Sequence, residues 1–190
     1  MTLDQAAIHE AGHAVADYVL GLRCESVELT HHEVEQVEDH GQVMSANPQY
    51  GYKHDSKKAM NDTMRDASIA CCAGLAAEHV ICGVPLEVDN LNARADFANI
   101  IDFELRGMPI PGKRRGCVGD EGTWNYIEKT LRKARTLVPQ HQDLIRKLAD
   151  VLVERKKLSG EEVKLLLDEW RRPAVTTEPE AKPAPKNGKG

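Results

Sequence analysis

A stripe of apolar residues at helical spacing, running through residues 3–22, constrains the fold of this chain more than any other feature. The apolar positions recur every three or four residues, as expected for a helix with one face in a hydrophobic core. They are Leu3, Ala6, Ala7, Ala11, Ala14, Val15, Tyr18, Val19 and Leu22. The same helix carries His9, Glu10 and His13, which are the first candidates for a functional site.

A second long helix is predicted to begin at Asp55 or Ser56, either of which can cap it, and to end at Ile81 before Gly83. Its centre, ASIACCAGLAAEH, consists almost entirely of small residues, which allow another helix backbone to approach closely. The helix over residues 3–22 is the natural candidate for that neighbour.

The rest of the pattern predicts a mainly α fold with a small β-hairpin or sheet. Residues 25–46 alternate between apolar and polar around an acidic loop, HHEVEQVEDHG, which is typical of a hairpin. A capping box of Ser159 and Glu162 begins a final helix. The other predicted helices begin near Ala93 and end before Gly107, and cover residues 123–137 and 140–157, with Pro139 separating the last two.

Residues 1–172 are predicted to form one domain and residues 173–190 a disordered tail. A chain of 190 residues with 41% hydrophobic content is long enough for one domain with a real core. The tail, PAVTTEPEAKPAPKNGKG, has the composition of a disordered segment.

Composition excludes several function classes. A net charge of −5, without a basic stripe interleaved with aromatic residues, argues against nucleic acid as a partner. The five cysteines form no Cys-x-x-Cys pair, which indicates free thiols in a reducing compartment. The opening run does not resemble a signal peptide, and no apolar stretch approaches the ~20 residues that span a bilayer. We therefore expect a cytoplasmic chain without a membrane span.

His9, Glu10 and His13 form the pattern H-E-x-x-H, which is typical of a zinc hydrolase. Histidines four residues apart lie on one face of a helix, about 6 Å from each other, and can ligate one Zn²⁺ ion. The ion lowers the pKa of a bound water to about 7, and the glutamate can then take a proton from this water as general base. The sequence therefore predicts His9 and His13 as metal ligands and Glu10 as the catalytic residue.

The third metal ligand must come from a distant part of the chain. The extended pattern H-E-x-x-H-x-x-G-x-x-H is excluded, because Ala16 and Val19 occupy its glycine and third histidine. Asp17 lies two helical turns, about 12 Å, from His9, so the two cannot share one ion on a straight helix. Glu78 is a candidate because a glutamate on a second helix completes another large group of such sites; alternatively, it orients a ligand histidine.

Three segments resemble the peptidase domain of the FtsH-type AAA+ zinc metalloproteases. The first is IHEAGHAVADYVLG, whose H-E-A-G-H that family shares. The second, CCAGLAAEHVICG, is similar to the family's G-G-R-A-A-E-E-x-x-x-G. The third, ARTLVPQHQDLIRKLADVLVERKKLSGEEVKLLL, resembles its C-terminal helices. The matches occur in the family's order and extend over about residues 6–167.

The resemblance implies that an aspartate at the start of the helix after the second segment is the third ligand. Asp96, in NARADFANIIDF, occupies that position. The link that follows Gly83 is longer than in the family, which leaves Asp89 as an alternative beside Glu78. The family also has an edge strand beside its active site, and CESVELTHH falls at the matching place. An edge strand can bind an extended peptide by strand addition; alternatively, this strand only closes a small sheet.

The resemblance implies a zinc-dependent endopeptidase acting on unfolded or flexible polypeptides. The chain contains no G-x-x-x-x-G-K-[ST] motif for nucleotide phosphates, so the activity expected of it is independent of ATP, and a separate unfoldase or ATPase is a possible partner. Because the family forms hexameric rings, a homo-oligomer is also possible. Two other functions remain open: a non-catalytic zinc-binding regulatory or interaction module of the same fold, and hydrolysis of a non-peptide amide or ester.

Overall fold

The computed structural model describes residues 1–30, 40–45, 51–86, 91–105 and 121–172. The predicted tail, residues 31–39 of the acidic loop and Asp89 lie outside these residues. Among the described helices, none is both long and apolar enough to cross a bilayer.

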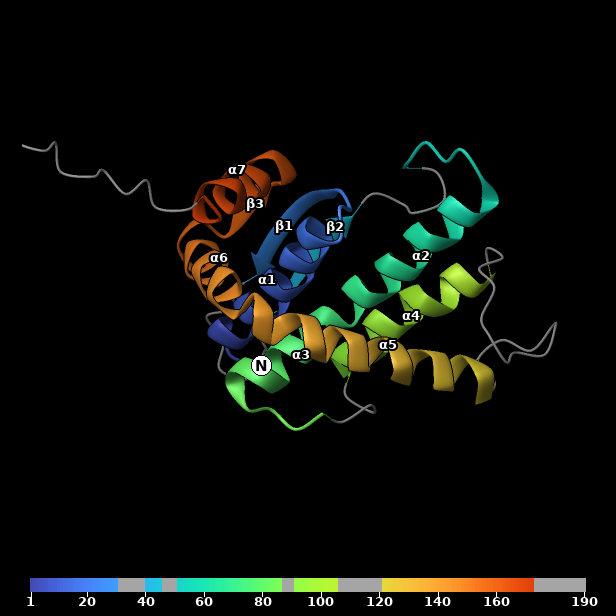
Figure 1. The fold of residues 1–190 in the computed structure, drawn as a ribbon. Helices are drawn as coiled ribbons and strands as arrows, with labels where there is room; N and C mark the ends of the chain where they lie inside the picture. Colours follow the sequence, from blue (N-terminus) through green and yellow to red (C-terminus); the bar gives the residue numbers. More distant parts are fainter. Residues whose placement is uncertain (31–39, 46–50, 87–90, 106–120, 173–190) are drawn as a thin grey trace, which may run out of the picture.

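The described residues form a mainly helical fold with one small antiparallel sheet, as predicted (Figure 1). The helices are α1 (Leu3–Val19), α2 (Lys57–Cys71), α3 (Ala73–Ala77), the π-helix η1 (Glu78–Cys82), α4 (Leu91–Leu105), α5 (Glu121–Gln140), α6 (Gln142–Arg155) and α7 (Gly160–Trp170). The strands are β1 (Cys24–Thr30), β2 (His40–Ser45) and β3 (Lys157–Ser159).

Helix α1 lies at the centre of the fold, in contact with α3, α6, β1 and β2. A capping box at Thr2 and Gln5 fixes its start: the Gln5 amide donates to Thr2 Oγ1 at 3.3 Å, and the Thr2 amide donates to Gln5 Oε1 at 3.0 Å. The predicted apolar stripe is buried in the main core. Because α1 has packed neighbours on several sides, its polar residues His9 and Glu10 are buried as well.

The sheet has the order β2-β1-β3, with Val27 of β1 opposite both Val43 and Leu158. The alternative in which β1 is an edge strand is therefore wrong, because β3 occupies its second side. Strand β3 escapes sequence detection because three residues are too few to show an alternating period. Within the described part of the sheet, β2 is the edge strand that lies against α1.

The second long helix is divided into α2, α3 and η1, although the sequence predicts one helix. Ser56 caps α2 as expected, with its hydroxyl accepting from the Ala59 amide at 3.1 Å. The α-helical ladder is interrupted at Cys72, whose amide donates to the Ile69 carbonyl at 3.1 Å. Small residues let α3 approach α1 closely, as predicted: a Cβ on Gly12 would lie 2.8 Å from the Ala73 carbonyl oxygen.

The C-terminal helices follow the prediction with one change. Helix α5 continues through Pro139 and ends at Gln140, so the break lies at His141 and not at the proline. A proline near the end of a helix removes only one hydrogen bond of the ladder, which makes it a weak terminator there. The predicted capping box of Ser159 and Glu162 is present at the start of α7.

Candidate metal centre

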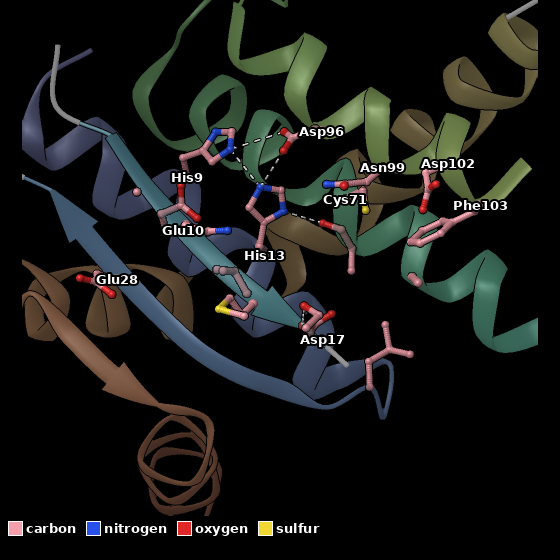
Figure 2. A pocket seen from close by; sticks show the side chains of 18 of the residues that line it. His9, Glu10, His13, Asp17, Glu28, Cys71, Asp96, Asn99, Asp102 and Phe103 are labelled. Atoms are coloured by element: carbon pink, nitrogen blue, oxygen red, sulfur yellow. Dashed lines mark hydrogen bonds and ion pairs between the residues drawn. The ribbon is translucent and has the colours of Figure 1, made fainter. Parts of the chain in front are cut away.

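Three side chains from two helices converge in the structure (Figure 2). His9 and His13 lie one turn apart on α1, with their Nε2 atoms 2.9 Å from each other. Asp96 lies on α4, with Oδ2 3.4 Å from His9 Nε2 and Oδ1 3.3 Å from His13 Nε2. One ligand atom from each residue lies within 4.8 Å of the others, so the group can hold a metal ion.

Both histidine rings are oriented from behind by an acceptor at Nδ1. His9 Nδ1 contacts Glu78 Oε1, and His13 Nδ1 lies 2.7 Å from the Ala70 carbonyl oxygen. A hydrogen bond at Nδ1 fixes the ring so that Nε2 faces the metal position, which is the usual support for a metal-binding histidine. Glu78 therefore takes the orienting role and does not belong to the ligand group.

The three residues fit a divalent cation. Asp96 is 8% exposed, and its Oδ2 atom has no hydrogen-bond partner, although a buried carboxylate oxygen normally has one. Two Nε2 atoms that face each other at 2.9 Å repel unless a proton or a cation lies between them. A ligand set of two imidazoles and one carboxylate is common for zinc but does not by itself identify the metal.

Without a metal, the histidines and carboxylates of the centre stabilise each other's charged forms. Burial alone lowers the pKa of His9, but the neighbouring carboxylates of Asp96, Glu78 and Glu10 outweigh burial and raise this pKa to about 10. Burial raises the pKa of Asp96, but the neighbouring His13 and His9 outweigh it and lower this pKa to about 2. Asp96 is therefore ionised, and a metal that binds here displaces the proton that His9 otherwise holds.

Two glycines allow the backbone to pass close to the ligand histidines and to Glu10. A Cβ on Gly74 of α3 would lie 2.5 Å from His13 Nε2 and 2.6 Å from His9 Nε2. A Cβ on Gly41 of β2 would lie 2.4 Å from Cγ of Glu10. Real Cβ atoms do not approach other heavy atoms so closely, so each position requires glycine unless its neighbours move.

Glu10 is 5% exposed, and desolvation by burial raises its pKa. It lies in the same groove as the ligands, beneath β2, which crosses α1 between Glu10 and Asp17 (Figure 2). The groove has a volume of about 810 Å³ and is lined by α1, by residues 41–45 of β2, and by side chains of α2 and α4. A carboxylate and a candidate metal site thus share one open groove.

Sequence analysis identified His9, Glu10, His13 and Asp96, and the structure brings all four together. His79, which follows Glu78 in the chain, lies outside this group and has Nδ1 2.9 Å from the Val84 carbonyl oxygen. The sequence did not identify the roles of several other residues. The signal for Gly74 was its position in the run of small residues, whereas nothing marked Gly41, Asp17 or Ser45.

The sequence matches no protein-family model, and a search of curated proteins finds no similar sequence.

Proposed function

We propose that this chain is a zinc-dependent metalloendopeptidase that cleaves unfolded or flexible polypeptides without ATP. The observation that carries the proposal is the convergence of His9, His13 and Asp96 in a groove that also contains Glu10. Zinc bound by these ligands would activate water and polarise the scissile carbonyl. Three protein ligands leave the fourth position of a tetrahedral site open to solvent or substrate.

Glu10 acts as the general base in this proposal. Its carboxylate takes a proton from the attacking water and delivers it to the leaving amine when the carbon–nitrogen bond breaks. Burial supports this role, because a raised pKa brings a carboxyl group closer to the range in which it can both accept and return a proton near neutral pH. Gly41 supports it as well, since the close backbone leaves the side chain little room to turn away.

The edge of β2 supports a peptide as substrate. Residues 41–45 of β2 line the groove, and β1 pairs with only one side of this strand. An extended peptide can hydrogen-bond to such an edge through its backbone, with little dependence on sequence. An open groove beside a strand suits a polypeptide better than the deep closed pocket expected of a small-molecule amidase.

The resemblance to the FtsH-type peptidase domain is part of the same proposal, since the family carries H-E-A-G-H on a helix and takes its third ligand from an aspartate on a later helix. A separate unfoldase or ATPase would then deliver folded substrates, and the chain could form a homo-oligomer. Neither partner is needed for cleavage of peptides.

Elemental analysis of the purified chain, beside His13→Ala and Asp96→Ala, tests the metal. We expect about one zinc per wild-type chain and loss of zinc in both variants. Zinc retained by the Asp96 variant would move the third ligand to Asp89 or Glu78. No zinc in the wild type, even after zinc is supplied, would refute the proposed centre.

Cleavage of an unfolded protein such as casein tests the reaction. We expect Glu10→Gln to retain zinc and to lose turnover. Glu154→Gln, an exposed substitution of the same kind on α6, should cleave at the wild-type rate. A Glu10 variant as fast as the wild type would exclude the proposed base, and zinc without any cleavage would favour a non-catalytic binding module.

A further inference from the structure

Asp17 is a buried carboxylate in the wall of the groove that neither the metal centre nor the proposed reaction uses. It follows His13 by one turn of α1, is 1% exposed, and lines the groove beside the end of β2 (Figure 2). The Ser45 hydroxyl donates a hydrogen bond to its Oδ2 atom. Within the described residues, nothing donates a hydrogen bond to the Oδ1 atom.

Asp17 also lacks a lysine or arginine partner in the part of the chain that the structure describes. No lysine or arginine there forms an ion pair with it. A carboxylate has room for about four hydrogen bonds, so the single bond from Ser45 leaves most of its capacity unused. Buried carboxylates are normally paired, which makes this residue an exception that requires an explanation.

The described lining of the groove is acidic as a whole. It contains five carboxylates and no lysine or arginine: Glu10, Asp17, Glu28, Asp96 and Asp102. The roles of two are already assigned, because Asp96 is a ligand and Glu10 is the base. Glu28 is paired with Lys157 across the sheet. Asp17 is thus the buried carboxylate of the groove that is neither a ligand, nor the base, nor paired with a lysine or arginine, and the charge of His13 is the positive charge that acts on it.

Asp17 is placed where it can contact a side chain of a bound peptide close to the scissile bond. One helical turn corresponds to about 6 Å of rise, and an extended peptide covers this distance in about two residues. Strand β2 runs along α1 from Gly41, against Glu10, to Ser45, against Asp17. A peptide added to the β2 edge would therefore extend from the reacting centre toward Asp17.

We propose that Asp17 is a specificity-determining residue that selects polypeptides with a lysine or arginine side chain within about two residues of the cleaved bond. The inference rests on the proposed peptidase function and adds a substrate class to it. The cationic side chain enters the groove beside Asp17 and donates to its Oδ1 atom, which gives the carboxylate the partner that it lacks. An acidic side chain at the same position meets an acidic wall and is rejected.

The test uses the zinc-loaded full chain and a set of unstructured fluorogenic peptides. Their ends are blocked, so that the only charge is Lys, Gln or Glu at one position, and this position is moved through the residues on each side of the cleaved bond. We expect kcat/KM for the best Lys peptide to exceed that for its Glu counterpart at least about tenfold, as for a charge-assisted hydrogen bond. We expect Asp17→Asn to reduce this ratio about tenfold.

Two control variants separate charge from structure. In Asp17→Asn, the new side chain can still accept the hydrogen bond from Ser45 but carries no charge. Ser45→Ala removes the hydrogen bond and keeps the carboxylate. If the charge of Asp17 selects the peptide, Ser45→Ala therefore retains the Lys preference. Asp150→Asn changes the net charge equally at an exposed position of α6 and should leave the preference unchanged. A Lys preference retained in Asp17→Asn, or equal cleavage of all peptides, would overturn the inference while leaving the peptidase function intact.

A peptide-binding measurement distinguishes failure of the inference about Asp17 from failure of the proposed reaction. If the wild type cleaves none of the peptides, fluorescence anisotropy of the same peptides on zinc-loaded Glu10→Gln measures the preference directly. Tighter binding of Lys peptides that Asp17→Asn abolishes supports the inference, although hydrolysis has failed. Equal binding of the Lys and Glu peptides, or no binding of either, overturns it.

Discussion

Replacement of Gly74 by alanine should abolish tight metal binding without unfolding the protein. The new Cβ would lie 2.5 Å from His13 Nε2, 2.6 Å from His9 Nε2 and 2.7 Å from His9 Cδ2. Comfortable contacts of carbon atoms are about 3.5 to 4 Å, so the rings or α3 must move by about 1 Å. Metal–ligand distances tolerate only about 0.2 Å.

The expected magnitudes follow from these distances. Overpacking of a core costs about 1–3 kcal/mol, which a folded domain of this size can survive. A change that only disturbs the orientation of metal ligands typically reduces metal affinity 10- to 100-fold. Because the methyl group would contact both ligand nitrogens directly, we expect a loss of zinc affinity of at least about 100-fold.

Zinc titration with a competing chromophoric chelator measures the affinity, and urea unfolding of the metal-free protein measures the stability. Gly12→Ala is the matched variant: its Cβ would meet the Ala73 carbonyl oxygen and the Ala77 Cβ, both at 2.8 Å, in the same α1–α3 contact but not at the ligand nitrogens. We expect similar destabilisation in both variants and a larger loss of zinc affinity in Gly74→Ala. Wild-type zinc affinity in Gly74→Ala would refute the reasoning.

Three further predictions test other parts of the structure. Glu78→Gln should weaken zinc binding about 10-fold or more, because it removes the charge at His9 Nδ1; equal affinity by the same titration would show that Glu78 does not support the ligand. Burial raises the pKa of Asp17 to about 6, so its protonation stabilises the fold fully below pH 3.8 and this contribution is lost as the pH rises through 6. The difference from the ordinary value of 3.8 corresponds to about 3 kcal/mol, so Asp17→Asn should be more stable than the wild type by up to about that amount at pH 8 and by little at pH 4, as measured by urea unfolding. Leu167→Ala should destabilise the protein by about 2–5 kcal/mol because Leu167 is fully buried, whereas Leu165→Ala, at a residue that is 68% exposed, should change thermal unfolding little.

The local features of the fold could be predicted from the sequence. The stripe of α1, the hairpin and the capping box at Ser159 depend on residues a few positions apart, and regular backbone geometry fixes where such residues lie. The same geometry placed His9 and His13 on one face of α1 before any tertiary contact was considered. Glu10 followed from the pattern, since its position next to His9 on the helix was already determined.

Features that depend on packing between distant elements could not be predicted in this way. Strand β3 is defined by its pairing with β1 and not by its own three residues, so the sequence left open whether β1 is an edge strand, and the structure places it between β2 and β3. The break at Cys72 lies within a run of small residues that mixes alanine with weaker helix formers such as cysteine and glycine, and this composition does not mark where the ladder is interrupted. The buried carboxylate of Asp17 becomes visible only when the opposite wall of the groove is known.

The sequence by itself determined that this chain presents two histidines and a glutamate on one helix, because the helical repeat fixes the spacing of nearby side chains. Only the tertiary structure decided that Asp96 lies within 3.4 Å of the histidines, that Glu78 supports His9 from behind, and that Gly74 leaves room for both rings. The physical reason is that the packing of whole helices and strands sets the distances between residues far apart in the chain. These distances cannot be read from the local pattern of the sequence.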